Sequence, residues 1–391
     1  CLVHLGRPSE AEASFEETLR LDPQNEGALR GKAAVLSKQE RWPDAIACLR
    51  EALGASGGAS ADIRVELAKC LTEHGVQLKA TGQPSLKLFQ EAVQVCEGYA
   101  PAYYQLGVDH SEAGRSAEAR ERYARAVRLH PGYVEAWNNL GVACRSLGEL
   151  DHALEAYSMA LKVNVNCRKT RENMAIVLLD LGARNLQQKS LKAASGYLKR
   201  ALAFNSRNAD IFFNLAVMYA EKQKWDQAKA NYELCVHFEP AHANAWNNLG
   251  VIHRRQANGD AAIESFGQAL KIEPKMNLAN KNLGALYGST GRMADAIKLT
   301  RLALETSPRD AEAFNNLALL FRDQCDIGSC LEYLDECLRL DPENPHACSN
   351  RLMTLNYPSE RSREDVFEAH RSWGERLERA VPAQYTSWEP A

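Results

Sequence analysis

One heptapeptide, Ala-Trp-Asn-Asn-Leu-Gly-Val, occurs twice in this chain, at residues 136–142 and again at residues 245–251. Shorter relatives of it recur along the chain, and the asparagines at positions 214, 248, 282 and 316 follow one another at intervals of 34 residues. A fixed period of this length indicates an array of similar units that stack in one dimension. A single globular core is excluded, because 391 residues exceed the size at which one core stops growing.

Each unit has the pattern of a helical hairpin. In the unit at 134–167, an apolar stripe begins at Trp137, Gly148 interrupts the helical pattern, and a second stripe is centred on Tyr157. Gly141 allows the two helices to approach closely. Proline, which starts a helix but does not continue one, recurs where successive units meet, at Pro131, Pro240, Pro274, Pro308 and Pro342. Period and pattern are typical of the tetratricopeptide repeat. The predicted fold class is all-α: a right-handed superhelical solenoid of these repeats with a C-terminal capping helical segment.

The period divides the chain into two regions. We expect about ten units over residues 1–344, the first of them partial, and we expect capping helices and a junction to an absent catalytic domain over 345–391. The units at 61–99 and 168–208 are longer than the others, with extra residues between their two helices. An extended helical hairpin is favoured over a dedicated binding loop there. Because the chain opens in mid-repeat on Cys1, we expect it to be a fragment of a longer protein.

Charge and cysteine usage narrow the class of partner. The charges of the 47 basic and 50 acidic side chains nearly cancel, so we expect no long-range electrostatic attraction to nucleic acid or to an anionic membrane. The longest apolar stretch, residues 174–179, is far shorter than the roughly 20 residues that span a bilayer. The 11 cysteines are scattered, without C-x-x-C spacing, and we interpret them as reduced, mostly core-packing thiols. These features predict a cytoplasmic and nuclear protein that binds neither nucleic acid nor membrane.

Catalytic signatures are missing from the sequence. We find no phosphate-binding glycine loop, no H-E-x-x-H pair and no nucleophile elbow. His110, His253 and His370 have the residue type of a general base, but none has a recognisable partner, so surface or packing roles are favoured. We therefore expect no catalytic residue, no cofactor-binding residue and no metal ligand in this chain.

The most informative pattern is an asparagine that recurs at one position of the first helix in successive units. We call these residues the ladder asparagines: Asn139, Asn173, Asn214, Asn248, Asn282, Asn316 and, in the capping helix, Asn350. Their apolar neighbour points into the stack, so the ladder asparagines are expected to form a row on a different face. A carboxamide both donates and accepts, so the row is predicted to bind the backbone of extended peptides, weakly and with little sequence preference. The alternative interpretation is that these asparagines cap or link helices within the stack.

A second mode of peptide binding is disfavoured by the residues beside the ladder. A clamp for a terminal carboxylate, as in co-chaperone adaptors, needs basic residues at neighbouring first-helix positions of successive repeats. The position before each ladder asparagine is occupied instead by Asn138, Phe213, Asn247 and Asn315, with only Lys281 basic.

Several segments together resemble one family. They include Ala-Pro-Ala-Tyr-Tyr-Gln-Leu-Gly-Val at 100–108 and the long unit around 173–182. The non-repeat tail is more specific, with Asn-Arg-Leu at 350–352, Phe-Glu-Ala-His-Arg at 367–371 and Gln-Tyr-Thr-Ser-Trp at 384–388. On these residues the chain resembles the tetratricopeptide portion of SPINDLY-type protein O-glycosyltransferases.

The resemblance implies a parent enzyme that glycosylates Ser or Thr of intracellular proteins. The donor would be GDP-fucose (O-fucose) or UDP-GlcNAc (O-GlcNAc), bound by a catalytic domain beyond residue 391, so no sugar nucleotide is expected in this chain. The resemblance also implies that the ladder guides extended Ser/Thr-containing segments and that repeats mediate a homodimer. Gln105 replaces the asparagine in one unit, and Gly31 and Glu66 replace it in earlier ones, so recognition should weaken toward the N-terminal end. The alternative is a stand-alone scaffold or adaptor without catalytic activity.

Overall fold

The computed structural model describes residues 7–357 and 362–380, and every regular element within those ranges is a helix. The chain divides into two compact units, Cys1–Ser206 and Arg207–Ala391. The first contains α1 (Pro8–Leu21), α2 (Glu26–Lys38), α3 (Trp42–Ala55), α4 (Ala61–Ala80), α5 (Leu86–Val95), α6 (Ala100–Glu112), α7 (Ser116–Leu129), α8 (Val134–Ser146), α9 (Leu150–Val163), α10 (Arg168–Gln187) and α11 (Leu191–Phe204). The second contains α12 (Ala209–Glu221), α13 (Trp225–Phe238), α14 (Ala243–Arg255), α15 (Gly259–Ile272), α16 (Asn277–Ser289), α17 (Met293–Thr306), α18 (Ala311–Asp323), α19 (Ile327–Leu340), α20 (Pro345–Thr354) and α21 (Arg363–Ala380).

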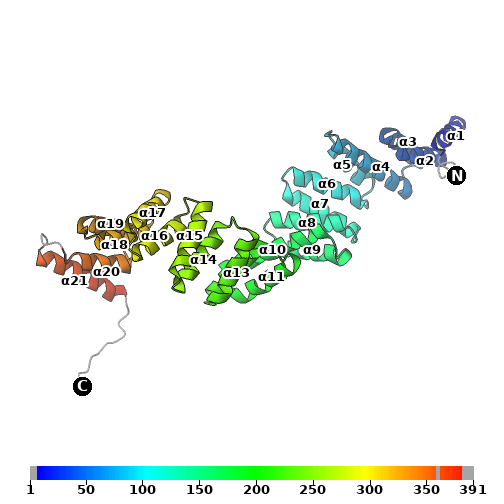
Figure 1. The fold of residues 1–391 in the computed structure, drawn as a ribbon. Coiled ribbons are helices and arrows are strands. Elements are labelled where there is room, and N and C mark those ends of the chain that lie inside the picture. The colour runs from blue at the N-terminus through cyan, green and yellow to red at the C-terminus, as the bar shows by residue number, and fades with distance from the viewer. Residues whose placement is uncertain (1–6, 358–361, 381–391) are drawn as a thin grey trace, which may run out of the picture. The chain divides into compact units, whose positions relative to one another are not determined.

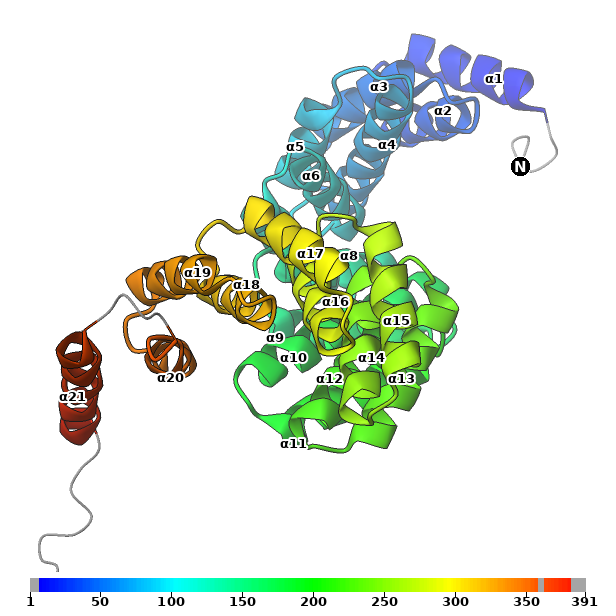
Figure 2. The ribbon, with the colours of Figure 1, turned by 60° about the vertical axis from the view of Figure 1, so that its left-hand side comes forward.

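Within each unit the helices pair as hairpins, and the second helix of one hairpin packs on the first helix of the next (Figure 1). The helices α14, α15, α16 and α17 form two such consecutive hairpins (Figure 2). Local signals place the ends: Asn208 and Asp310 accept hydrogen bonds from backbone N–H groups in the first turns of α12 and α18. Gly148 adopts a left-handed φ of +76° between α8 and α9, where the sequence predicts a helix break. The all-helical repeat fold class is confirmed.

The two helices of a hairpin meet where a small residue faces a ring. A Cβ atom added at Gly141 would lie 2.5 Å from Cε1 of Tyr157, and one at Gly250 would lie 2.6 Å from Cε1 of Phe266. Both rings are fully buried. The small residue is therefore needed for close approach, as the sequence pattern predicts.

The two long units are built by extending their first helices. α4 and α10 have 20 residues each, whereas α6, α8 and α12 have 13. The extra residues continue the helix by about two turns and do not form a separate loop. The extended hairpin is confirmed, and the dedicated binding loop is wrong for both units.

Beyond residue 344 the chain forms two helices. α20 packs on α19 and places Ala347 in the core that Cys330, Leu334 and Cys337 line. α21 contacts α20 and lies in the region where the sequence predicts capping helices. Residues 381–391 of the predicted junction lie outside the described residues, and the domain boundary at residue 344 stays a prediction.

The described residues also bear on membrane, metal and redox chemistry. No helix among them is long and apolar enough to cross a membrane. Within them, no group of three or more His, Cys, Asp or Glu side chains is arranged to hold a metal ion. The ten cysteines in the described ranges are all unpaired, and Cys235, Cys330 and Cys337 are buried at core positions. The interpretation as unpaired, mostly core-packing thiols is confirmed for these ten.

Candidate peptide-binding surface

The seven ladder asparagines lie on first helices, one in each of α8, α10, α12, α14, α16, α18 and α20. All seven are partly buried. The apolar residue that follows the asparagine, such as Leu140, Leu249 or Leu317, is buried, so the carboxamide lies beside the core and not within it. The structure therefore places every ladder asparagine at the same position of its repeat.

Most ladder asparagines reach back to the preceding repeat. We call the residue immediately before the ladder position the linker residue. Four ladder carboxamides donate from Nδ2 to the linker residue of the repeat before: Asn139 to the Tyr104 hydroxyl (3.3 Å), Asn173 to Asn138 Oδ1 (2.9 Å), Asn282 to Asn247 Oδ1 (3.0 Å) and Asn350 to Asn315 Oδ1 (3.0 Å). These bonds connect neighbouring repeats, so they support the alternative interpretation that the asparagines link the stack.

The linker residue decides whether the bond forms. Phe213 has no acceptor in its side chain, and Asn248 donates instead to the Tyr232 hydroxyl at 3.0 Å. Lys281 also lacks an acceptor and is held by Asp310 and Glu312. Asn316 then makes no side-chain hydrogen bond within the described part of the chain.

Two of the linker asparagines, Asn138 and Asn247, are the most buried part of this network. Asn247 is 3 % exposed, donates from Nδ2 to Asn248 Oδ1 (3.2 Å) and accepts from Asn282, so it connects two ladder positions. Asn138 makes the equivalent two bonds in the compact unit Cys1–Ser206: it donates to Asn139 Oδ1 and accepts from Asn173 Nδ2. Sequence reasoning missed the linking role of these asparagines, although the Asn-Asn doublets at 138–139, 247–248 and 315–316 are the signal that marks them.

In α4, where the ladder asparagine is absent, an ion pair connects the neighbouring repeats instead of a carboxamide hydrogen bond. Glu66 stands at the ladder position of α4 and pairs with the linker residue Arg30, with Nη2 and Oε1 2.7 Å apart. Coupling between repeats is thus retained, while the carboxamide that would read a peptide backbone is replaced by a carboxylate. The expectation that peptide recognition weakens toward the N-terminal end stays a prediction.

The basic clamp is not assembled from the linker positions. Lys281 is the only basic side chain among Asn138, Phe213, Asn247, Lys281 and Asn315, and both of its acidic partners belong to this chain. Its charge is therefore already neutralised by intramolecular ion pairs.

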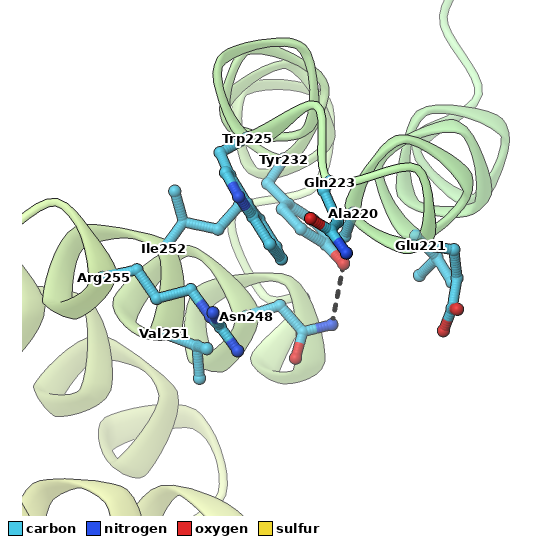
Figure 3. Close-up of a pocket in the computed structure, with 10 residues that line it drawn as sticks. Ala220, Glu221, Gln223, Trp225, Tyr232, Asn248, Val251, Ile252 and Arg255 are labelled. Carbon is cyan, nitrogen blue, oxygen red and sulfur yellow. Dashed lines mark hydrogen bonds between the residues drawn. The ribbon is translucent and has the colours of Figure 1, made fainter. Parts of the chain in front are cut away.

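A groove opens at Asn248 among α12, α13 and α14 (Figure 3). Its volume is about 630 Å³. Tyr232 and Asn248 lie side by side, joined by their hydrogen bond, and Trp225 and Arg255 line the groove beside them. The Arg255 guanidinium carbon lies 4.6 Å from the centroid of the Trp225 ring. Burial raises the pKa of Tyr232 to about 12, so its hydroxyl stays protonated at neutral pH and can donate.

The three histidines of general-base type lie far apart along the chain. His110 Nδ1 accepts a hydrogen bond from Arg115 Nε. His253 is 8 % exposed, and its Nδ1 has no hydrogen-bond partner among the described residues. His370 is exposed on α21. Packing and surface roles fit these surroundings.

Stability should fall in mild acid because of His253. Burial, followed by the charge of Lys229, lowers the pKa of His253 below its ordinary value of 6.5, although Glu233 and Glu264 oppose this. The unfolded chain therefore binds a proton at His253 more readily than the folded chain does. The stability that neutral His253 contributes is complete above pH about 6.5 and is lost as pH falls through the folded-state pKa. We expect His253→Phe to reduce the loss of melting temperature between pH 7.5 and pH 5.5, measured by circular dichroism. His237→Gln, at an exposed position of α13, is the control, and an equal reduction there would contradict the assignment.

Comparison with known proteins identifies the repeats. The tetratricopeptide repeat family model matches residues 2–57, 104–165, 243–276 and 311–344. Among curated proteins, the chain is similar to the probable UDP-N-acetylglucosamine–peptide N-acetylglucosaminyltransferase SPINDLY of Oryza sativa subsp. japonica, with 41% identity over 59 residues, which are 15% of this chain and 6% of that protein. The SPINDLY protein of Arabidopsis thaliana is 47% identical over 51 residues, or 13% of this chain and 6% of that protein. The match thus spans about 6% of the length of these relatives.

Solved structures with related folds have low sequence identity. The C-terminal part of a tetratricopeptide repeat-containing protein from Cytophaga hutchinsonii covers 63% of this chain and 98% of its own, with 15% identity and a TM-score of 0.49. YrrB, described as a tetratricopeptide repeat protein with an unusual peptide-binding site, covers 50% of this chain and 97% of its own, with 19% identity and a TM-score of 0.42. The family-model matches carry the conclusion. This chain is built with tetratricopeptide repeats.

Proposed function

We propose that this chain binds extended segments of other polypeptides along the ladder asparagines, as the protein-recognition region of a SPINDLY-like O-glycosyltransferase. The observation that carries the proposal is the presence of one partly buried carboxamide at the same helix position in six repeats and in the capping helix α20. Tetratricopeptide repeats generally mediate protein–protein interaction, and the local similarity to SPINDLY proteins supports the proposed class of parent enzyme. The substrates would be Ser/Thr-containing segments of intracellular proteins, with O-fucose from GDP-fucose or O-GlcNAc from UDP-GlcNAc as the modification.

The link bonds leave part of each carboxamide for a ligand. Asn282 uses one N–H on Asn247, and its Oδ1 accepts no hydrogen bond from the described residues. A second N–H and a carbonyl oxygen are the groups that pair with a C=O and an N–H of an extended backbone. At about 1 kcal/mol net for each hydrogen bond, several rungs give weak binding once the ordering of the peptide is subtracted. Broad substrate tolerance follows, because the backbone is common to all sequences.

The test uses ladder asparagines that make no bond to the linker residue of the preceding repeat. Asn214 bonds only to its own helix at Asp210 O, Asn248 bonds to Tyr232 and to its neighbour Asn247, and Asn316 makes no side-chain hydrogen bond with the described residues. Replacing these three by Ala is expected to lower the affinity for extended Ser/Thr-rich peptides about ten-fold or more, as three lost hydrogen bonds imply. Fluorescence anisotropy with labelled peptides measures this effect, and circular dichroism checks that helix content is retained.

A matched control is available in the same unit. Asn231 on α13 makes the same kind of bond to its own helix, to Gln227 O at 2.8 Å, and Asn244 on α14 is exposed. Replacing both by Ala should leave peptide affinity unchanged. Unchanged affinity in the triple ladder variant would refute the role of the ladder.

The proposal that the parent protein is a glycosyltransferase is tested separately, by the sequence of the parent gene. An α/β continuation beyond residue 391 supports it, and a stop codon there favours the stand-alone scaffold.

A further inference from the structure

The groove at Asn248 offers more hydrogen-bond donors than its own residues use. Trp137 and Trp246 donate their indole N–H to the carbonyl oxygens of Pro131 and Pro240, at 2.9 Å each. Trp225, in the groove, makes no such bond within the described part of the chain. The Tyr232 hydroxyl accepts from Asn248 and donates to none of the described residues. Both groups therefore line the groove with an N–H or O–H that has no acceptor among the described residues.

Arg255 adds a cation that lacks an acidic partner. Arg292 also stacks on an aromatic ring, Tyr287, but its guanidinium pairs with Asp295 at 2.7 Å. Arg255 stacks on Trp225 in the same manner and makes no ion pair with any described residue. Asp226, the acid beside Trp225 in sequence, accepts a hydrogen bond from Gln256. The guanidinium thus keeps its donors directed to solvent or to a ligand.

The repeat pattern does not account for a cation at this position. The equivalent residue, seven positions after the ladder position, is acidic in five other repeats, at Glu73, Glu112, Asp180, Glu221 and Asp323, is serine in two, at Ser146 and Ser289, and is basic in one, at Lys38. A basic residue near the end of a helix complements the helix dipole, yet seven other repeats do without one. The arginine is therefore a local departure, and it lies where Trp225, Tyr232 and Asn248 line the groove.

We propose that this groove selects an acidic side chain, Asp or Glu, from the polypeptide bound along the ladder asparagines. The carboxylate pairs with Arg255 over the face of Trp225, and the Trp225 indole N–H and the Tyr232 hydroxyl donate to it or to the adjoining backbone. Asn248 keeps one N–H for the same peptide. Because Glu221 lines the groove on the side away from Arg255 (Figure 3), the acidic side chain is expected at the Arg255 side. This inference rests on the proposed function and adds a sequence preference to it.

The test compares two labelled Ser/Thr-rich peptides that differ at one site, Glu in one and Gln in the other. The Glu peptide is expected to bind this chain about ten-fold more tightly, as one charge-assisted hydrogen bond implies. The preference should shrink as salt rises, because the pair is only partly buried. Arg255→Gln, which keeps an aliphatic stem against Trp225, is expected to remove the preference, so that the variant binds the Glu and Gln peptides equally.

Glu221→Gln is the matched control, since it changes one charge in the same groove. It should retain the preference for the Glu peptide. Equal binding of the two peptides by the unmodified chain would overturn the inference and leave the proposed function standing. A preference that persists in Arg255→Gln would overturn it as well. If neither peptide binds, the proposed function fails and the inference fails with it.

Discussion

Replacing Gly141 by Ala is expected to destabilise the hairpin of α8 and α9 by about 1–3 kcal/mol, the cost of overpacking a close-packed core. The added Cβ would meet three ring atoms of Tyr157, at 2.5 to 2.7 Å, and that ring is fully buried and has no space to retreat. In an exposed helix the same substitution is favourable, because Ala loses less backbone entropy than Gly. The sign of the effect at Gly141 is therefore set by packing alone.

Gly196 is the matched control within the same unit. It lies in α11, and a Cβ added there would meet nothing within 4 Å. Gly196→Ala is expected to stabilise α11 by about 0.5–1 kcal/mol. Repeat arrays open in parts, so native-state hydrogen exchange of the α8, α9 and α11 amides is a better measurement than one melting temperature. Stabilisation in both variants would show that the helices separate easily and that Gly141 is not required for packing.

The repeat period accounts for how much of the fold is predictable from the sequence. A spacing of 34 residues identifies the hairpins, and the interrupting Gly148 and the small Gly141 identify their turn and their contact. The insertions in the units at 61 and 168 are also visible, but their form depends on a competition between helix and loop. Helix extension prevails in α4 and α10. In the added turns, Gly75 of α4 is buried against Phe89, and Gly182 of α10 is buried against Leu198.

The candidate site is less predictable because it depends on pairs of residues in different repeats. The position of the ladder asparagines follows from the sequence, but their partners do not. Asn282 and Asn316 are equivalent in sequence, yet only Asn282 has an acceptor 35 residues before it, at Asn247. The identity of the linker residue thus divides the ladder into carboxamides that link repeats and carboxamides that remain available.

Replacing Asn247 by Ala is expected to destabilise the stack of α14 and α16 by about 1–3 kcal/mol, the cost of leaving buried polar groups unpaired. Asn247 is 3 % exposed and holds both Asn248 Oδ1 and Asn282 Nδ2, so one substitution removes two hydrogen bonds in a setting of low polarity. Asn316→Ala removes no hydrogen bond and is expected to change stability by less than about 0.5 kcal/mol. Hydrogen exchange in α14, α16 and α18 measures both variants.

A double-mutant cycle separates the link from the loss of the side chain. Asn247→Ala and Asn282→Ala should show a coupling free energy of about 0.5–1.5 kcal/mol, in the range of one buried hydrogen bond. A coupling near zero would mean that the Asn282 carboxamide is not held by the preceding repeat and is as free for a peptide as Asn316. A measurable coupling would instead have a second consequence, for peptide binding by the linked asparagines. Their orientation is fixed before a ligand arrives, so a peptide pays less to order them and binds more tightly for the same contacts.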